Sequence, residues 1–140
     1  MSWLKSMMEK EPKESENPIG TVVIGNIQPD MHDTAKEAVR KALKKAGFKT
    51  IDVGKNAKPE AFVDKVKESK ADILALSVNT VPAKNNLSAL VDALKAANLK
   101  VKIIIGGAAV KKEDADAIGA IFGKSKEEGV EIAKKIVAGK

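Results

Sequence analysis

The chain has 140 residues and a mass of 14.9 kDa, enough for one ordinary domain with a buried core. Its composition of 44% hydrophobic and 31% charged residues excludes a disordered chain, and no apolar run reaches the roughly 20 residues that span a bilayer. The absence of cysteine excludes disulfides and thiolate chemistry, and the single histidine, His32, excludes a zinc site built from several histidines.

The net charge of +6 raises the question of a polyanionic partner. The lysines lie mostly on the polar faces of predicted helices, Arg40 is the only arginine, and aromatic residues make up 3% of the chain. Bases would therefore have little to stack on, and we expect neither a nucleic-acid partner nor a membrane partner. The N-terminus lacks the apolar core and cleavage site of a secretory signal, so we expect a cytoplasmic protein.

Residues 1–19 are predicted to form a polar N-terminal extension, and residues 20–140 the domain itself. Within the extension, Trp3, Leu4, Met7 and Met8 make a small apolar cluster. Two interpretations stay open for this segment. It is either a disordered tail, or a short element that docks on the domain or on a partner.

From residue 21 onward, apolar bursts of strand length alternate with helical patterns. The predicted strands are Thr21–Ile27, Thr50–Val53, Asp72–Ser77, Val101–Ile105 and the short Ala120–Phe122. Apolar residues at helical spacing run from Ala35 to Ala46, Phe62 to Val66, Leu87 to Leu94 and Gly129 to Val137. The pattern is that of five βα units.

Strands that alternate with crossover helices predict a parallel sheet covered on both faces. Five units favour an α/β, flavodoxin-like (Rossmann-like) doubly wound domain with strand order 2-1-3-4-5. Ligands of such domains bind beyond the carboxyl ends of the strands, where the strand order reverses beside strand 1. We therefore expect the loops after strands 1, 3 and 4 to converge on the functional site.

The contents of these loops exclude several common occupants of the fold. The turn after strand 1 lacks the glycines of a dinucleotide fingerprint, and no phosphate-binding GxxxxGK[ST] motif is present. Strand 3 ends in Ser77, where a phospho-accepting receiver domain needs aspartate. No GxSxG elbow presents that serine as a hydrolytic nucleophile.

The loop after strand 1 does contain Asp30 two residues before His32. An imidazole can ligate a metal through one nitrogen while a carboxylate holds the other. One protein ligand is too few for a bare ion, but it suffices for a metal already held in a macrocycle. The alternative from the residues alone is that Asp30 caps the following helix and His32 is a solvated loop residue.

Asp30 to Ala35 (DMHDTA) resembles the DxHxxG motif of the cobalamin-binding domain family, most closely in the small corrinoid proteins of methyltransferase systems. ADILALS at Ala71–Ser77 and IIIGGAAV at Ile103–Val110 are also similar to the family pattern. The likeness covers roughly residues 20 to 138. It implies a cobalamin or related corrinoid as cofactor and methyltransferase subunits as partners.

Carried over residue by residue, the resemblance implies that His32 is the axial cobalt ligand and that Asp30 hydrogen-bonds its far nitrogen. It also implies that Ser77, Gly106 and Gly107 accommodate the nucleotide tail of the cofactor. The expected cofactor-binding residues are Asp30, Met31, His32, Asp33, Ala35, Ser77, Asn79, Thr80, Gly106 and Gly107.

The sequence departs from the family pattern at two of these positions. Ala35 replaces a glycine, where a Cβ against the corrin or in a glycine-only conformation would cost on the order of 1 kcal/mol or more. Asn79 replaces a leucine and puts an amide where an apolar wall is expected. We expect the substitution Ala35→Gly to tighten corrinoid binding.

The function implied is that of a corrinoid carrier subunit, rather than a complete enzyme, which carries a methyl group on cobalt between a substrate methyltransferase and an acceptor methyltransferase. The alternative is a non-catalytic binding or regulatory module of the same fold that has lost the corrinoid and acts through protein contacts. Retention of a corrinoid that depends on His32 separates the two.

Overall fold

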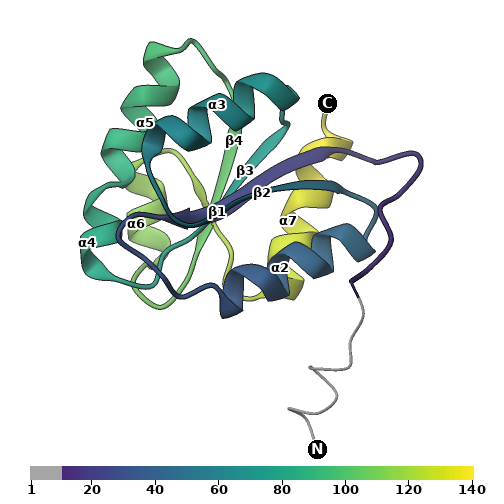
Figure 1. The fold of residues 1–140 in the computed structure, drawn as a ribbon, viewed down its shortest axis with the longest axis horizontal. Coiled ribbons are helices and arrows are strands. Elements are labelled where there is room, and N and C mark those ends of the chain that lie inside the picture. Colours follow the sequence, from purple (N-terminus) through teal and green to yellow (C-terminus); the bar gives the residue numbers. More distant parts are fainter. Residues whose placement is uncertain (1–10) are drawn as a thin grey trace, which may run out of the picture.

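Five parallel strands form one sheet in the order β2-β1-β3-β4-β5 in the computed structural model, which describes residues 11–140 (Figure 1). The flavodoxin-like order predicted from the sequence is confirmed. The strands are β1 (Thr21–Ile27), β2 (Lys49–Ala57), β3 (Ile73–Ser77), β4 (Lys102–Gly106) and β5 (Ile121–Phe122). The helices are α2 (Thr34–Lys45), α3 (Pro59–Ser69), α4 (Val81–Asn85), α5 (Leu87–Ala96), α6 (Lys112–Ala117) and α7 (Lys126–Ala138).

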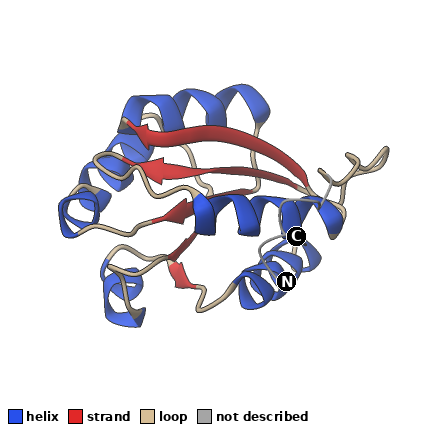
Figure 2. Ribbon diagram, turned by 60° about the horizontal axis from the view of Figure 1, so that its bottom comes forward, coloured by secondary structure: helices blue, strands red, loops and turns tan. Residues whose placement is uncertain are grey.

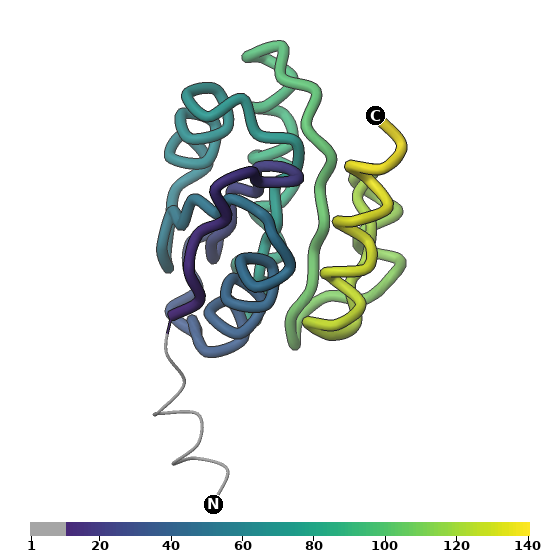
Figure 3. The backbone as a smooth tube through the Cα atoms, turned by 90° about the vertical axis from the view of Figure 1, so that its right-hand side faces the viewer, coloured from purple at the N-terminus to yellow at the C-terminus, as the bar shows by residue number. Residues whose placement is uncertain are grey.

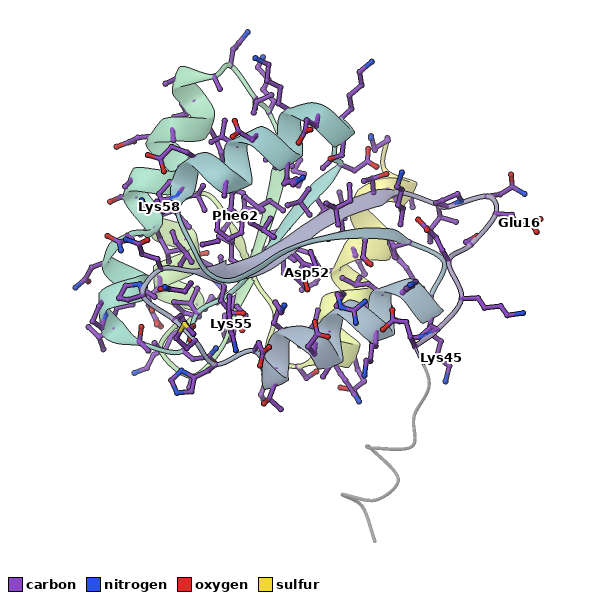
Figure 4. All side chains as sticks on the ribbon, in the orientation of Figure 1. Glu16, Lys45, Asp52, Lys55, Lys58 and Phe62 are labelled. Atoms are coloured by element: carbon purple, nitrogen blue, oxygen red, sulfur yellow. The ribbon has the colours of Figure 1, made fainter. Side chains whose placement is uncertain are left out.

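Helices cover both faces of the sheet (Figure 2). The helices α2 and α7 pack together on one face, and α3 and α5 pack together on the other. Each face has its own buried apolar cluster, because the central strands β1 and β3 send alternate side chains to opposite sides. Phe62 extends from α3 into the cluster on the side of α3 and α5 (Figure 4). Phe48 belongs to the cluster on the side of α2 and α7.

Two features of the fold differ from the sequence prediction. The edge strand β2 continues to Ala57 instead of ending at Val53, because its pairing with β1 resumes after register shifts near Gly25. Gly54 and Asn56, both with positive φ, accommodate these irregularities. The helices α4 and α6 have five and six residues, too few for an apolar stripe to repeat, so periodicity did not reveal them.

The described chain begins close to α2 (Figure 3), and charged side chains hold it there. Glu11 accepts hydrogen bonds of 2.7 Å from two nitrogens of Arg40 and one of 2.9 Å from Lys44. Lys36, on the same helix, is buried and donates to both carboxylate oxygens of Asp52. Asp52 lies on β2 (Figure 4).

The apolar cluster of Trp3, Leu4, Met7 and Met8 lies outside the described residues, and the division between residues 1–19 and 20–140 stays a prediction. Within residues 11–140, none of the helices combines the length and apolar character needed to cross a lipid bilayer. The expected cytoplasmic location likewise stays a prediction.

Candidate functional site

The loops after β1, β3 and β4 meet at the carboxyl edge of the sheet. Strand register brings Ser77 beside Asn26 on one side and Gly106 on the other. Beyond the strands, the backbone N–H of Asn79 donates to Asp30, and the backbone N–H of Ala108 donates to the side chain of Asn79. Residues 49 and 29 positions apart in the chain are therefore joined directly.

Asp30 and His32 form a hydrogen-bonded pair at this edge. The Oδ1 atom of Asp30 lies 3.1 Å from Nδ1 of His32 and accepts a 3.0 Å hydrogen bond from the His32 backbone N–H. The Asp30 side chain is fully buried, whereas that of His32 is 70% exposed. The imidazole is thus anchored on one side and open on the other.

The electrostatics of Asp30 favour its ionised form. Burial by itself raises the pKa of the Asp30 carboxyl, but hydrogen bonds from the backbone N–H groups of His32 and Asn79 and from the His32 ring outweigh it, so the pKa lies below its ordinary value. An ionised carboxylate only accepts hydrogen bonds, so Nδ1 of His32 is the protonated nitrogen. In the neutral imidazole Nε2 then carries the lone pair, and Nε2 has no hydrogen-bond partner among residues 11–140.

The interpretation of Asp30 as a helix cap is wrong. The residue at the N-cap of α2 is Asp33, whose side chain makes no capping hydrogen bond. The Asp30 carboxylate instead accepts hydrogen bonds from the backbone N–H groups of His32 and Asn79.

An apolar cavity of about 490 Å³ lies between the sheet, α2 and α7. Its volume falls within the range of roughly 300 to 1,000 Å³ typical of small-molecule pockets. Small residues leave this space open, among them Ala38 on α2, Gly123 after β5 and Gly129 on α7. Ser77 and the Gly106–Gly107 pair line it from the carboxyl edge, and their role at the nucleotide tail of a cofactor stays a prediction.

The glycine pair is required by close backbone approach. A Cβ on Gly107, whose φ is +122°, would lie 2.2 Å from the carbonyl oxygen of Val78. A Cβ on Gly106 would lie 2.7 Å from the carbonyl oxygen of Gly123. Contacts this short are not found in proteins, so neither position admits another residue without movement of the loop.

Ala35 occupies an ordinary helical position rather than a glycine-only one. It is the second residue of α2, it is absent from the residues with positive φ, and it lies exposed at the cavity. The expectation of backbone strain at Ala35 is therefore wrong. The only remaining effect of the alanine is that its methyl group narrows the cavity.

The amide of Asn79 does not fill the cavity. Its Nδ2 lies 3.2 Å from Asp30 Oδ2 and 3.1 Å from Ser77 Oγ, and its Oδ1 accepts from Ala108. The polar group expected to disturb an apolar wall thus takes part in the hydrogen bonds of the site.

Three further predicted residues surround the pair without lining the cavity. Met31 is 57% exposed beside His32, and Asp33 is the N-cap residue of α2. Thr80 donates a 2.8 Å hydrogen bond to the carbonyl of Pro29 and caps α4 by accepting from Ala83. Thr80 therefore acts on the shape of the loops, and the role of these residues in cofactor binding stays a prediction.

Sequence reasoning missed Asn26. It is fully buried near the end of β1, and its Nδ2 donates to the carbonyl of His32 at 3.0 Å. Its Oδ1 has no hydrogen-bond partner among the described residues. The available signal was the one polar amide within the apolar strand TVVIGNI, since a buried amide in a central strand needs a partner.

These observations define a flavodoxin-like ligand-binding domain with one accessible imidazole and an apolar cavity near the switch point of the sheet. The sequence matches the B12 binding domain family over residues 20–133, and the chain belongs to that family.

Relatives agree with this assignment. Trimethylamine corrinoid protein 2 of Methanosarcina mazei is 39% identical over 126 residues, which cover 88% of this chain and 57% of that protein. Dimethylamine corrinoid protein 3 of the same organism is 34% identical over 96% of this chain and 81% of its own length. The crystal structure of a cobalamin-binding protein from Desulfitobacterium hafniense is 32% identical, with a TM-score of 0.81 over 84% of this chain and 58% of that one. The chain spans less than two thirds of the trimethylamine corrinoid proteins that it matches.

Proposed function

We propose that this chain binds a corrinoid with His32 as the axial cobalt ligand and serves as the methyl-carrying subunit of a methyltransferase system. The observation that carries the proposal is the Asp30–His32 pair, whose free imidazole nitrogen faces solvent beside the apolar cavity. Family membership and the methylamine corrinoid relatives support the choice of ligand.

The residues present fit a corrinoid. A metal that arrives inside a macrocycle needs only an axial ligand from the protein, and a single exposed imidazole meets that need. The cavity offers apolar walls and several small lining residues, as a buried apolar group of a ligand requires. Within residues 11–140, His, Cys, Asp and Glu side chains form no group of three or more able to hold a bare ion.

Each residue of the site has a distinct task. Asp30 keeps the proton on Nδ1 of His32 and directs Nε2 outward. The Gly106–Gly107 pair and Ser77 line the cavity at the ends of β4 and β3. A bound corrinoid would supply a cobalt centre able to take a methyl group from one methyltransferase and give it to another. The partner methyltransferases are therefore part of the proposal.

The test is to incubate the purified protein with hydroxocobalamin, remove free cofactor by desalting, and record the visible spectrum. We expect a retained corrinoid whose spectrum shows histidine in place of the cofactor's own base. In His32→Ala we expect that signature to disappear and to return partly when free imidazole is added. Val81→Ala, which shortens an exposed side chain at the start of α4 and leaves the Asp30–His32 pair untouched, controls for non-specific loss of binding.

Two results would contradict the proposal. A colourless wild-type protein would favour the alternative, a module of the same fold that acts through protein contacts. A spectrum that is the same with and without His32 would show that the cofactor binds with its own base and that His32 is not a ligand.

A further inference from the structure

Asn79 lies where the three loops of the carboxyl edge meet. Its backbone N–H donates to Oδ2 of Asp30 at 2.7 Å, and its Nδ2 lies 3.2 Å from the same oxygen. Nδ2 also lies 3.1 Å from Ser77 Oγ and 3.3 Å from the carbonyl oxygen of His32. On its other side, Oδ1 accepts a 3.2 Å hydrogen bond from the backbone N–H of Ala108. One side chain thus contacts all three loops.

The hydrogen bonds divide the two oxygens of the Asp30 carboxylate between two residues. Oδ1 is held by the backbone N–H and Nδ1 of His32, and Oδ2 is held by the backbone N–H and Nδ2 of Asn79. With one oxygen held by each residue, the carboxylate cannot rotate without breaking bonds on both sides. Hydrogen bonds to an ionised carboxylate are stronger than those between neutral groups, so its orientation is well determined.

Asn79 also connects this pair to Ser77. No hydrogen bond joins Asp30 to Ser77 directly in the described part of the chain, and the Asn79 amide lies between them. The leucine expected from the family pattern could supply neither the donor toward Asp30 nor the acceptor toward Ala108. The amide therefore does what a purely apolar residue at this position cannot do.

We propose that Asn79 is a positioning residue of the corrinoid site. Its side-chain donor fixes the Asp30 carboxylate and, through it, the imidazole of His32, while its side-chain acceptor ties the loop after β3 to the loop after β4. The inference rests on the proposed function for the identity of what His32 binds. The positioning itself is a property of the protein without cofactor.

Two substitutions separate the two halves of the amide. Asn79→Asp keeps the size of the side chain and an acceptor for Ala108, but removes both N–H donors and sets a second carboxylate against Asp30. Asn79→Leu removes donor and acceptor together. The matched control is Asn86→Asp, because the Asn86 amide donates to the carbonyl of Gln28 at 2.7 Å without contacting Asp30.

The first measurement is amide hydrogen exchange by NMR in the cofactor-free protein. We expect the His32 N–H, which donates to Asp30, to exchange about tenfold faster in Asn79→Asp and Asn79→Leu, as loss of a hydrogen bond to a charged group implies. The Ala108 N–H should stay protected in Asn79→Asp and lose protection in Asn79→Leu. Asn86→Asp should leave both amides unchanged. If Asn79→Asp does not fold, the His32 exchange in Asn79→Leu decides the question.

The second measurement is the spectrum after loading with hydroxocobalamin. We expect a smaller fraction of histidine-ligated corrinoid in Asn79→Asp than in the wild type, and a wild-type fraction in Asn86→Asp. Unchanged His32 exchange in both Asn79 variants would overturn the inference, as would an unchanged ligated fraction. If the wild-type protein takes up no corrinoid, the proposed function fails, while the exchange measurement still decides whether Asn79 positions the pair.

Discussion

Substitutions at Gly129 test whether part of the corrinoid enters the cavity. A small residue there should stabilise the protein, whereas a large one should weaken corrinoid binding. This residue is buried in the first turns of α7, where glycine costs about 1 kcal/mol relative to alanine. A Cβ built there meets no atom within 4 Å apart from the backbone of its own helix, so the added methyl group creates no clash. Gly129→Ala should therefore raise the free energy of unfolding by about 1 kcal/mol, or the melting temperature by about 4 °C.

A larger residue at the same position should block the ligand. Gly129→Leu places a branched side chain in the cavity of about 490 Å³ and leaves the Asp30–His32 pair untouched. Crowding of a well-filled site typically costs 1 to 3 kcal/mol, so hydroxocobalamin should bind roughly five- to 150-fold more weakly in a spectral titration. The control is Ala96→Leu, which adds a leucine at an exposed position of α5 on the opposite face.

Wild-type affinity in Gly129→Leu, with a melting temperature at least as high as that of the parent, would refute the idea that part of the ligand enters this cavity. A lower melting temperature in Gly129→Ala would instead refute the account of the helix, because it would show that the added methyl group is not accommodated.

Two further predictions concern α2. Ala35→Gly removes the methyl group that narrows the cavity, so corrinoid should bind severalfold more tightly. The free energy of unfolding should fall by up to about 1 kcal/mol, because glycine is a poorer helix former than alanine. Unchanged or weaker binding in the spectral titration would show that this methyl group is no obstacle. Hydrogen bonds from Arg40 lower the pKa of Glu37 from 4.5 to about 2, so its stabilisation is complete above pH 4.5 and is lost as the pH falls toward 2. Because Glu37 is 35% exposed, screening limits this contribution to about 1 kcal/mol or less. Arg40→Gln should flatten this acid-induced loss in urea unfolding, and an equally steep loss would count against the ion pair.

The fold was largely predictable because its determinants are local. Apolar runs such as TVVIGNI and stripes at helical spacing are properties of neighbouring residues, and right-handed crossovers leave few ways to arrange five βα units. The position of His32 at the switch point follows from the same reasoning. The extension of β2 to Ala57 did not follow, because it depends on bulged pairing with β1 rather than on its own sequence.

The chemistry of the site was only partly visible in the chain. The spacing of Asp30 and His32 suggested a supported imidazole, but nothing local shows which nitrogen is free or that Asp30 is buried and not a helix cap. Asn79 is the clearest case. In the sequence it only departs from an apolar pattern, whereas in the folded structure its side chain forms hydrogen bonds with Asp30 and Ala108. Hydrogen bonds between residues about 30 to 50 positions apart form only after the strands have aligned. The sequence therefore determined the helices and strands, whereas the tertiary structure decided which polar groups pair with one another.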